Sequence, residues 1–177
     1  MSGKQRKQRK QRKRSRRTAK DNGTRMESAV ESYLQWALDD LRIQRLRLHG
    51  SKDIGDIGNV FFHGRPVCIE VKWTQTMNAP QHMREAIREA GNMDSPYPWV
   101  VQKKADVGLT SINKLGQQHA YTTPETLDAM LALSPPHIQA IIKPEPLGRK
   151  KTMRLITLQE FAMMLNDGLS LGPDRED

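Results

Sequence analysis

The chain has 177 residues, of which 36% are hydrophobic and 28% are charged, and its formal net charge is +9. This length fits one domain, and the single cysteine excludes both an internal disulfide framework and a zinc knuckle of the CxxC type. Because no apolar stretch follows the basic start of the chain, we expect neither a signal peptide nor a membrane anchor, and we expect a cytoplasmic protein.

The positive charge lies mostly in the first twenty residues, which hold eleven of the 29 lysines and arginines and no acidic residue. The remainder has 18 basic and 20 acidic residues, a net charge of −2. Such a segment repels itself and cannot bury apolar surface, so we predict a disordered tail over residues 1–22 that binds DNA as a polyanion. The arginines expected to contact phosphates are Arg12, Arg14, Arg16 and Arg17.

The segment after the tail is predicted to be helical. Apolar residues recur at three- and four-residue spacing from Met26 to Leu41, which indicates an amphipathic helix of about five turns. Thr24 and Glu27 have the spacing of a capping box, a pattern typical of a helix start.

Extended segments are predicted next, over residues 43–48 and 54–62. The turn His63-Gly64-Arg65-Pro66 then leads into a buried strand over residues 67–71. The two segments around this turn are expected to form a hairpin.

The second half of the chain completes an α/β pattern. Its clearest elements are a helix over 79–90 with an apolar stripe of Met83, Ala86, Ile87 and Ala90, a buried strand over 99–101, a strand over 153–156, and a helix over 158–165 that follows a capping box of Thr157 and Glu160. Residues 105–150 are interpreted as a helical insertion, with helices starting at Pro124 and Pro136, and residues 168–177 as a flexible acidic end. The order of elements predicts one α/β domain over residues 23–167, with a mixed central sheet flanked by helices.

The residues that carry the chemistry lie between Gly50 and Trp73. Side chains two apart on a strand share a face, so Glu70 and Lys72 are expected to point the same way, and the hairpin would bring Asp56 toward them. Two carboxylates with room for waters are ligands that Mg²⁺ prefers, and Mn²⁺ accepts the same oxygens. A nearby ammonium can stabilise the charge that develops on a phosphodiester under attack.

Several assignments stay open on these patterns alone. A Glu-x-Lys pair on a strand is more often a solvated ion pair, and Asp53 competes with Asp56 as the metal ligand. Glu27 is either a member of the site or only a helix cap, and Glu31 is the weaker candidate on the same helix.

The motifs Gly-Asp-Ile at 55–57 and Ile-Glu-Val-Lys at 69–72, together with Gly50-Ser51 and a glutamate in the first helix, resemble the PD-(D/E)xK nucleases. The resemblance is to the archaeal-type Holliday junction resolvases and their phage-encoded relatives, and it covers about residues 23–104. It implies a restriction-endonuclease-like fold with catalytic residues Asp56, Glu70, Lys72 and Glu27. The implied metal ligands are Asp56, Glu70, the backbone carbonyl of Val71, and Glu27. Gly55 stands where the family often has proline.

The function that follows is a Mg²⁺-dependent, structure-selective DNA endonuclease, a Holliday junction resolvase of DNA recombination and repair that works in the host cytoplasm if it is phage-encoded. The resemblance implies a DNA contact from Ser51. Lys103 and Lys104 could also reach a DNA phosphate, although a charge pair after a strand more often lies in a solvated loop. A four-way junction is cut at two symmetric points, so we expect a homodimer. The alternatives are another nuclease of this superfamily, restriction-type or DNA-end processing, and a non-catalytic nucleic-acid-binding protein.

Overall fold

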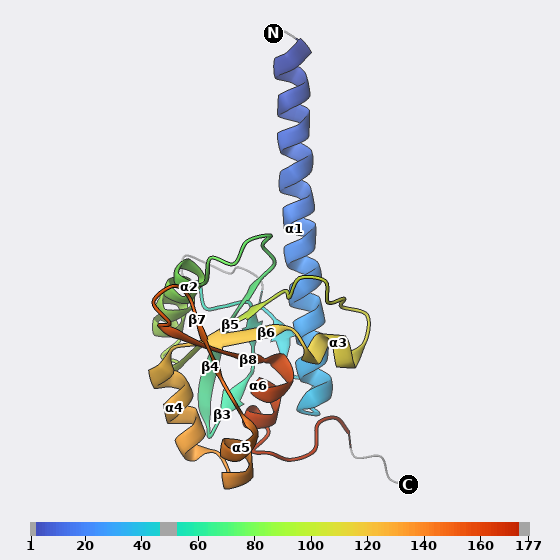
Figure 1. Cartoon of the computed structure of the whole chain (residues 1–177). Coiled ribbons are helices and arrows are strands. Elements are labelled where there is room, and N and C mark those ends of the chain that lie inside the picture. Colours follow the sequence, from blue (N-terminus) through green and yellow to red (C-terminus); the bar gives the residue numbers. More distant parts are fainter. Residues whose placement is uncertain (1–2, 47–52, 174–177) are drawn as a thin grey trace.

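The computed structural model describes residues 3–46 and 53–173 (Figure 1). In these ranges the strands are β1 (Gln44–Arg45), β2 (Ile57–Gly58), β3 (Phe61–Phe62), β4 (Arg65–Lys72), β5 (Tyr97–Gln102), β6 (His119–Thr122), β7 (Glu145–Leu147) and β8 (Met153–Thr157). The helices are α1 (Gly3–Ala37), α2 (Ala79–Asn92), α3 (Ile112–Gly116), α4 (Pro124–Leu133), α5 (Pro136–Ile141) and α6 (Leu158–Leu165). No helix in the described ranges combines the length and the apolar character needed to cross a membrane.

The strands form a mixed sheet in the order β1-β2-β4-β5-β6-β8-β7, with β3 paired to β4 beside this path. β4 and β5 run parallel, and every other pairing among the described strands is antiparallel. β4 is buried from Val67 to Val71, as expected for an inner strand with both faces covered. The α/β class and the mixed sheet flanked by helices are confirmed.

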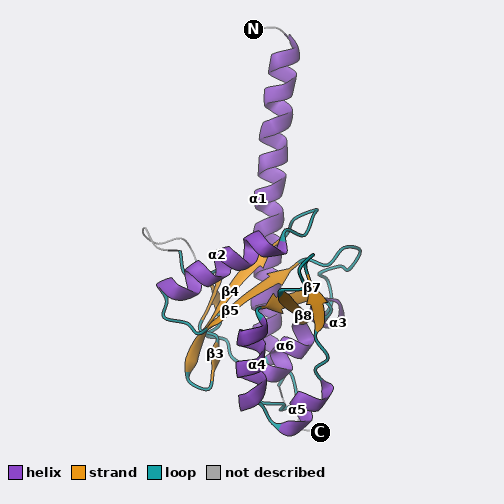
Figure 2. Cartoon of the chain, turned by 60° about the vertical axis from the view of Figure 1, so that its left-hand side comes forward, coloured by secondary structure: helices purple, strands orange, loops and turns teal. Residues whose placement is uncertain are grey.

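Different helices cover the two faces of the sheet (Figure 2). Ile69 and Val71 belong to the larger apolar core, which also contains the buried residues of α1 and α6. On the other face, Val100 and Tyr121 pack with Ala86 of α2 in a smaller core. Because neighbouring residues of a strand alternate in direction, Glu70 lies on the α2 side of the sheet.

α1 is longer at its amino-terminal end than the sequence predicted. The helix is continuous from Gly3, so residues 3–22, predicted to be a disordered tail, form its first half and extend away from the rest of the molecule (Figures 1 and 2). Lysine, arginine and glutamine are good helix formers, and a helix anchored by packing at one end needs no new nucleation to continue. Thr24 is therefore internal, and the predicted capping box with Glu27 is wrong.

The other end of α1 comes earlier than predicted. The helix ends at Ala37, and Asp39 has a left-handed φ of 46°, which breaks the helical path. Leu41, predicted to lie on the apolar face, is 86% exposed. Residues 168–171 lead back to this end of α1, where Gly172 N–H donates to Ala37 O at 3.1 Å and Leu171 packs against the core. The predicted flexible end therefore packs in its described part, and residues 174–177 lie outside the described ranges.

Residues 105–150 contain α3, α4 and α5, as expected of a helical segment, but they also supply β6 and β7 to the sheet, which corrects the prediction of an insertion. β6 pairs with β5 on one side and β8 on the other, so it is an inner strand. α4 and α5 begin at Pro124 and Pro136 as predicted, and the Thr123 side chain caps α4 by accepting a hydrogen bond from Thr126 N–H.

Candidate active site

Asp56 is fixed to β4 by its backbone and by its side chain. Asp56 N–H donates to Ile69 O at 2.9 Å, and its Oδ2 accepts a hydrogen bond from Val71 N–H at 2.7 Å. The preceding Gly55 has a φ of 92°, and a Cβ there would lie 3.1 Å from Ile69 O. Proline, whose φ is fixed near −65°, cannot adopt this conformation, which explains the glycine where the resembling family often has proline.

Lys72 joins the sheet to α2. Its ammonium pairs with Oε1 of Glu70 on the same strand and with Oε2 of Glu85 on α2, the latter at 2.8 Å. Burial alone would lower the pKa of Lys72, but the carboxylates of Glu70 and Glu85 outweigh it and raise that pKa. The same hydrogen bond from Lys72 lowers the pKa of Glu85. Lys72 is therefore held as a cation at neutral pH.

Two acidic side chains near Lys72 lie in surroundings that disfavour their charged forms. Burial raises the pKa of Asp56 to about 7, and the charge of Glu70 adds to this effect. Burial and then the neighbouring Glu70 raise the pKa of Glu89 on α2 to about 9. Glu70 and Glu89 are 7% and 2% exposed. We call Asp56, Glu70 and Glu89 the acidic cluster, and the main electrostatic feature of the site is that these carboxyl groups and Glu85 outnumber the one ammonium among them, that of Lys72.

The oxygens of the acidic cluster suit Mg²⁺ when waters complete the coordination. Among the described residues, no three His, Cys, Asp or Glu side chains are arranged to hold a metal ion by themselves. Mg²⁺ usually binds proteins through one or two carboxylates and keeps several waters, so Asp56 and Glu70 with a backbone carbonyl form a sufficient set. The hydrogen bond between Asp56 and Val71 N–H brings the backbone of Val71 beside them.

Glu27 and Glu31 are both engaged by Arg45 on β1. Oε2 of Glu27 accepts hydrogen bonds from Nη2 and Nε of Arg45 at 2.7 and 3.0 Å, and Oε1 of Glu31 accepts one from Arg45 N–H at 2.9 Å. The charge of Glu27 still contributes to the raised pKa of Asp56, so Glu27 lies near the acidic cluster while pairing elsewhere. Asp53, the rival of Asp56, is exposed, and its carbonyl accepts a hydrogen bond from Asn92 of α2.

A cationic and aromatic surface adjoins the site at the ends of β4 and β5. Trp73 directly follows Lys72. The guanidinium carbon of Arg25 lies 5.5 Å from the centroid of the Trp73 ring, and the ammonium of Lys103 lies 5.6 Å from it. A pocket of about 460 Å³ lies here, and its lining includes Trp73, Lys103 and His119. The backbone of Lys104 is held by Gln118, whose side-chain oxygen accepts a hydrogen bond from Lys104 N–H at 2.8 Å.

The other residues predicted to contact DNA lie on the amino-terminal part of α1 or outside the residues that the structure describes. Arg16 and Arg17 are exposed on α1, and Arg17 Nε lies 3.9 Å from Asp21 one turn later. Arg12 and Arg14 belong to the part of α1 for which only the backbone is described. Ser51 falls outside the described residues.

Glu85 and Glu89 were not identified from the sequence. Ile87, predicted to lie on the apolar stripe of α2, is 47% exposed, and Glu89 occupies the buried face instead, with Ala86 and Ala90. The available signal was spacing, since Glu89 lies three residues after the buried Ala86. An acidic residue at such a position needs a partner in the neighbouring layer.

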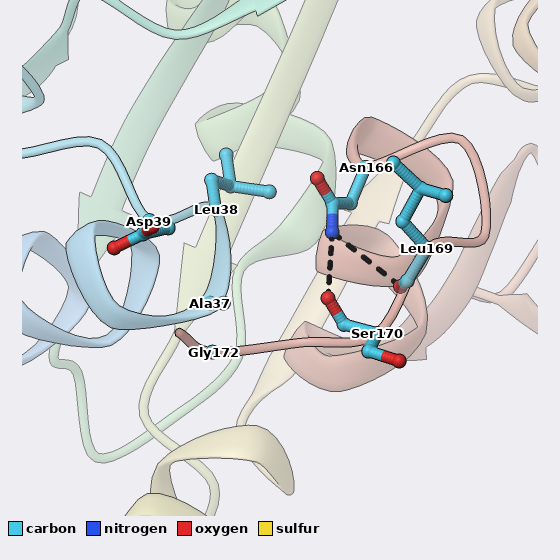
Figure 3. Close-up of a pocket in the computed structure, with 7 residues that line it drawn as sticks. All are labelled: Ala37, Leu38, Asp39, Asn166, Leu169, Ser170 and Gly172. Carbon is cyan, nitrogen blue, oxygen red and sulfur yellow. Dashed lines mark hydrogen bonds between the residues drawn. The ribbon is translucent and has the colours of Figure 1, made fainter. Parts of the chain in front are cut away.

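A second pocket, of about 260 Å³, lies between the end of α1 and residues 166–172 (Figure 3). Asn166 lines this pocket, and its Nδ2 donates hydrogen bonds to the carbonyl oxygens of Leu169 and Ser170 at 3.4 and 2.9 Å. Its lining contains none of the acidic cluster and a single carboxylate, Asp39, so it offers no comparable chemistry.

Comparison of the chain with protein-family models, with curated proteins and with solved structures found no match.

Proposed function

We propose that this protein is a divalent-cation-dependent DNA endonuclease in which Asp56 and Glu70 bind Mg²⁺ beside Lys72. The observation that supports this proposal is that the carboxyl groups of the acidic cluster, of which Glu70 and Glu89 are buried, lie near one ammonium, that of Lys72, which is shared between Glu70 and Glu85. Carboxylates removed from water are costly unless they are paired or bind a metal, so a divalent cation would relieve the cost that raises the pKa of Asp56.

Each residue of the site has a defined task in this proposal. Bound Mg²⁺ would supply a water of lowered pKa and neutralise the phosphate. The hydrogen bond from Val71 N–H holds the Asp56 carboxylate in a fixed orientation before any ion arrives. Lys72, kept as an ammonium by its two carboxylate partners, stabilises the charge that develops on the phosphate and does not act as the base.

The DNA strand is proposed to follow the surface around Trp73. Arg25 and Lys103 place positive charge beside the ring of Trp73, and Trp73 directly follows Lys72 in the sequence. An indole ring can stack on any DNA base, whatever the sequence. The basic half of α1 would add phosphate contacts that do not depend on sequence.

Branched DNA as substrate and a homodimer as the active form are further parts of the proposal. They are supported by the resemblance of the motifs around Asp56 and Glu70 to those of junction-resolving nucleases. A symmetric four-way junction needs two sites related by a two-fold axis, and a homodimer provides them. Sedimentation of the purified protein with and without a junction would measure the state directly.

The experiment that tests the function is cleavage of end-labelled four-way junction, flap and linear duplex DNA, with Mg²⁺ or with EDTA. We expect Mg²⁺-dependent cleavage that favours the junction and is lost in Glu70→Gln, while Glu160→Gln, which changes a half-buried carboxylate on α6, cleaves normally. Preference for linear duplex would favour a restriction-type or end-processing nuclease. Binding without cleavage in Mg²⁺ or Mn²⁺ would refute the enzyme and leave a nucleic-acid-binding protein.

A further inference from the structure

Among the described residues, Glu89 is an acidic residue with a buried oxygen that no hydrogen bond satisfies. It lies on the face of α2 that packs against β4 and against the loop before β2. Two contacts define this position: Ala86 O lies 3.7 Å from Cys68 Sγ, and Asn92 Nδ2 donates to Asp53 O at 2.7 Å. Glu89, between these two residues of α2, therefore faces the segment that carries Asp56.

The Glu89 carboxylate is almost completely removed from solvent. It is 2% exposed, and among the described residues its Oε2 is a buried side-chain oxygen with no hydrogen-bond partner. Its other oxygen, Oε1, lies 3.6 Å from Nη2 of Arg88, a largely exposed side chain. An unpartnered buried carboxylate oxygen is rare in a folded protein and calls for a group that the protein alone does not supply.

The neighbour of Glu89 across the interface is another carboxylate. Beyond the effect of burial, a hydrogen bond with Glu70 and the charges of Glu70, Asp53 and Asp56 raise the pKa of Glu89. The ammonium of Lys72 already pairs with Glu70 and Glu85. Two carboxylates that face each other away from water need a positive species between them, which is either a proton or a cation.

We propose that Glu89 accepts a hydrogen bond from a water ligand of the cation held by Asp56 and Glu70. The contact is through water because no three carboxylates of the described chain are arranged to touch one ion, and because Mg²⁺ keeps several of its waters. This inference rests on the proposed cation site and assigns that site a third acidic residue, supplied by α2. Glu89 is thus a positioning residue that increases the affinity for the ion.

The test is Mn²⁺ binding to the full-length, cation-free protein without DNA, followed by electron paramagnetic resonance of free Mn²⁺. We expect Glu89→Gln to weaken Mn²⁺ binding by about 10- to 100-fold, the usual effect of losing an outer partner of a metal site. Glu89→Asp keeps the charge and should bind Mn²⁺ more tightly than Glu89→Gln. Glu160→Gln, whose side chain caps α6, is the matched control and should bind like the parent protein.

A purely structural role gives the opposite order. If Glu89 were only a protonated acid that hydrogen bonds to Glu70, glutamine would preserve its length and its donor, so Glu89→Gln would bind Mn²⁺ like the parent and Glu89→Asp would be worse. That result would overturn the inference. Thermal melting in EDTA provides a check on folding, since glutamine keeps the length of Glu89 and cannot become a buried anion, so Glu89→Gln should melt at or above the parent temperature.

Failure of the inference and failure of the proposed function are distinguishable. If the parent binds Mn²⁺ and Asp56→Asn abolishes binding while Glu89→Gln binds Mn²⁺ as tightly as the parent, the cation site stands and the role of Glu89 is refuted. If the parent protein binds no Mn²⁺, both are refuted.

Discussion

Replacing Asp56 by asparagine should make the cation-free protein more stable, by an amount that depends on pH. Asparagine keeps an oxygen that can accept the hydrogen bond from Val71 N–H, and it removes the charge beside Glu70. The folded state raises the pKa of Asp56 from 3.8 to about 7, so folded protein holds this proton more tightly than unfolded protein does. Stability is therefore lost as pH rises from the unfolded value through the folded value, and asparagine avoids that loss.

The magnitude follows from the size of the shift. About three pKa units correspond to roughly 4 kcal/mol as an upper limit, at about 1.4 kcal/mol per unit. Partial exposure and relaxation of the charged state reduce this value, so we expect a gain of about 1–2 kcal/mol above pH 7, or about 3–6 °C in melting temperature. The gain should grow between about pH 4 and pH 7 and then level off.

The assay is urea unfolding of both proteins in EDTA at a series of pH values. Added Mg²⁺ should then reverse the order, because an ion at 100 times its Kd stabilises the protein that binds it by about 2.7 kcal/mol. A difference in unfolding free energy that is independent of pH, or a variant that is less stable at every pH in EDTA, would refute the electrostatic account of the site.

Three further predictions concern other parts of the molecule. Lys72→Met should abolish cleavage and lower the free energy of unfolding by about 2–4 kcal/mol, because it leaves Glu70 and Glu85 without their shared cation; full activity or unchanged urea unfolding would contradict this. Removing residues 1–20 should flatten the dependence of DNA affinity on salt, by a slope of about 0.9 for each phosphate that this segment neutralises, as measured by fluorescence anisotropy; an unchanged slope would exclude this segment from binding. Gln118→Leu should cost about 2–3 kcal/mol in urea unfolding, since Gln118 is fully buried and hydrogen bonds to Lys104 N–H and to the carbonyls of Gly108 and Lys114; a decrease below about 0.5 kcal/mol would show that these bonds contribute little.

The elements with strong local signals were predictable from the sequence. β4 follows from an apolar run that only Glu70 interrupts, and the capping box of Thr157 and Glu160 begins α6 as its spacing requires. The predicted position of Asp56 beside β4 also holds, since its backbone bonds to Ile69 and its side chain bonds to Val71. In each case the information lies within a short stretch of sequence, the longest running from Asp56 to Val71.

The features that escaped prediction depend on residues far apart in the chain. β6 consists of four residues, His119–Thr122, and it is a strand because β5 and β8 lie on either side of it. The role of Glu89 is visible only when α2 is placed over β4, because a glutamate on an isolated helix is normally solvated. The extension of α1 to Gly3 escapes prediction because repulsion between like charges opposes it, while helix propensity and the packed half of the helix favour it.

The continuity of α1 sets a length scale for the protein. Residues 3–22 span about 30 Å at 1.5 Å per residue, close to the 34 Å of one turn of B-form duplex. These residues belong to the same unbroken helix as Tyr33 and Leu34, which are buried in the core. The outer part of α1 is therefore rigidly connected to the packed part. If a DNA duplex binds along residues 3–22, as proposed, the continuous helix would hold it at a fixed distance and orientation relative to the rest of the protein.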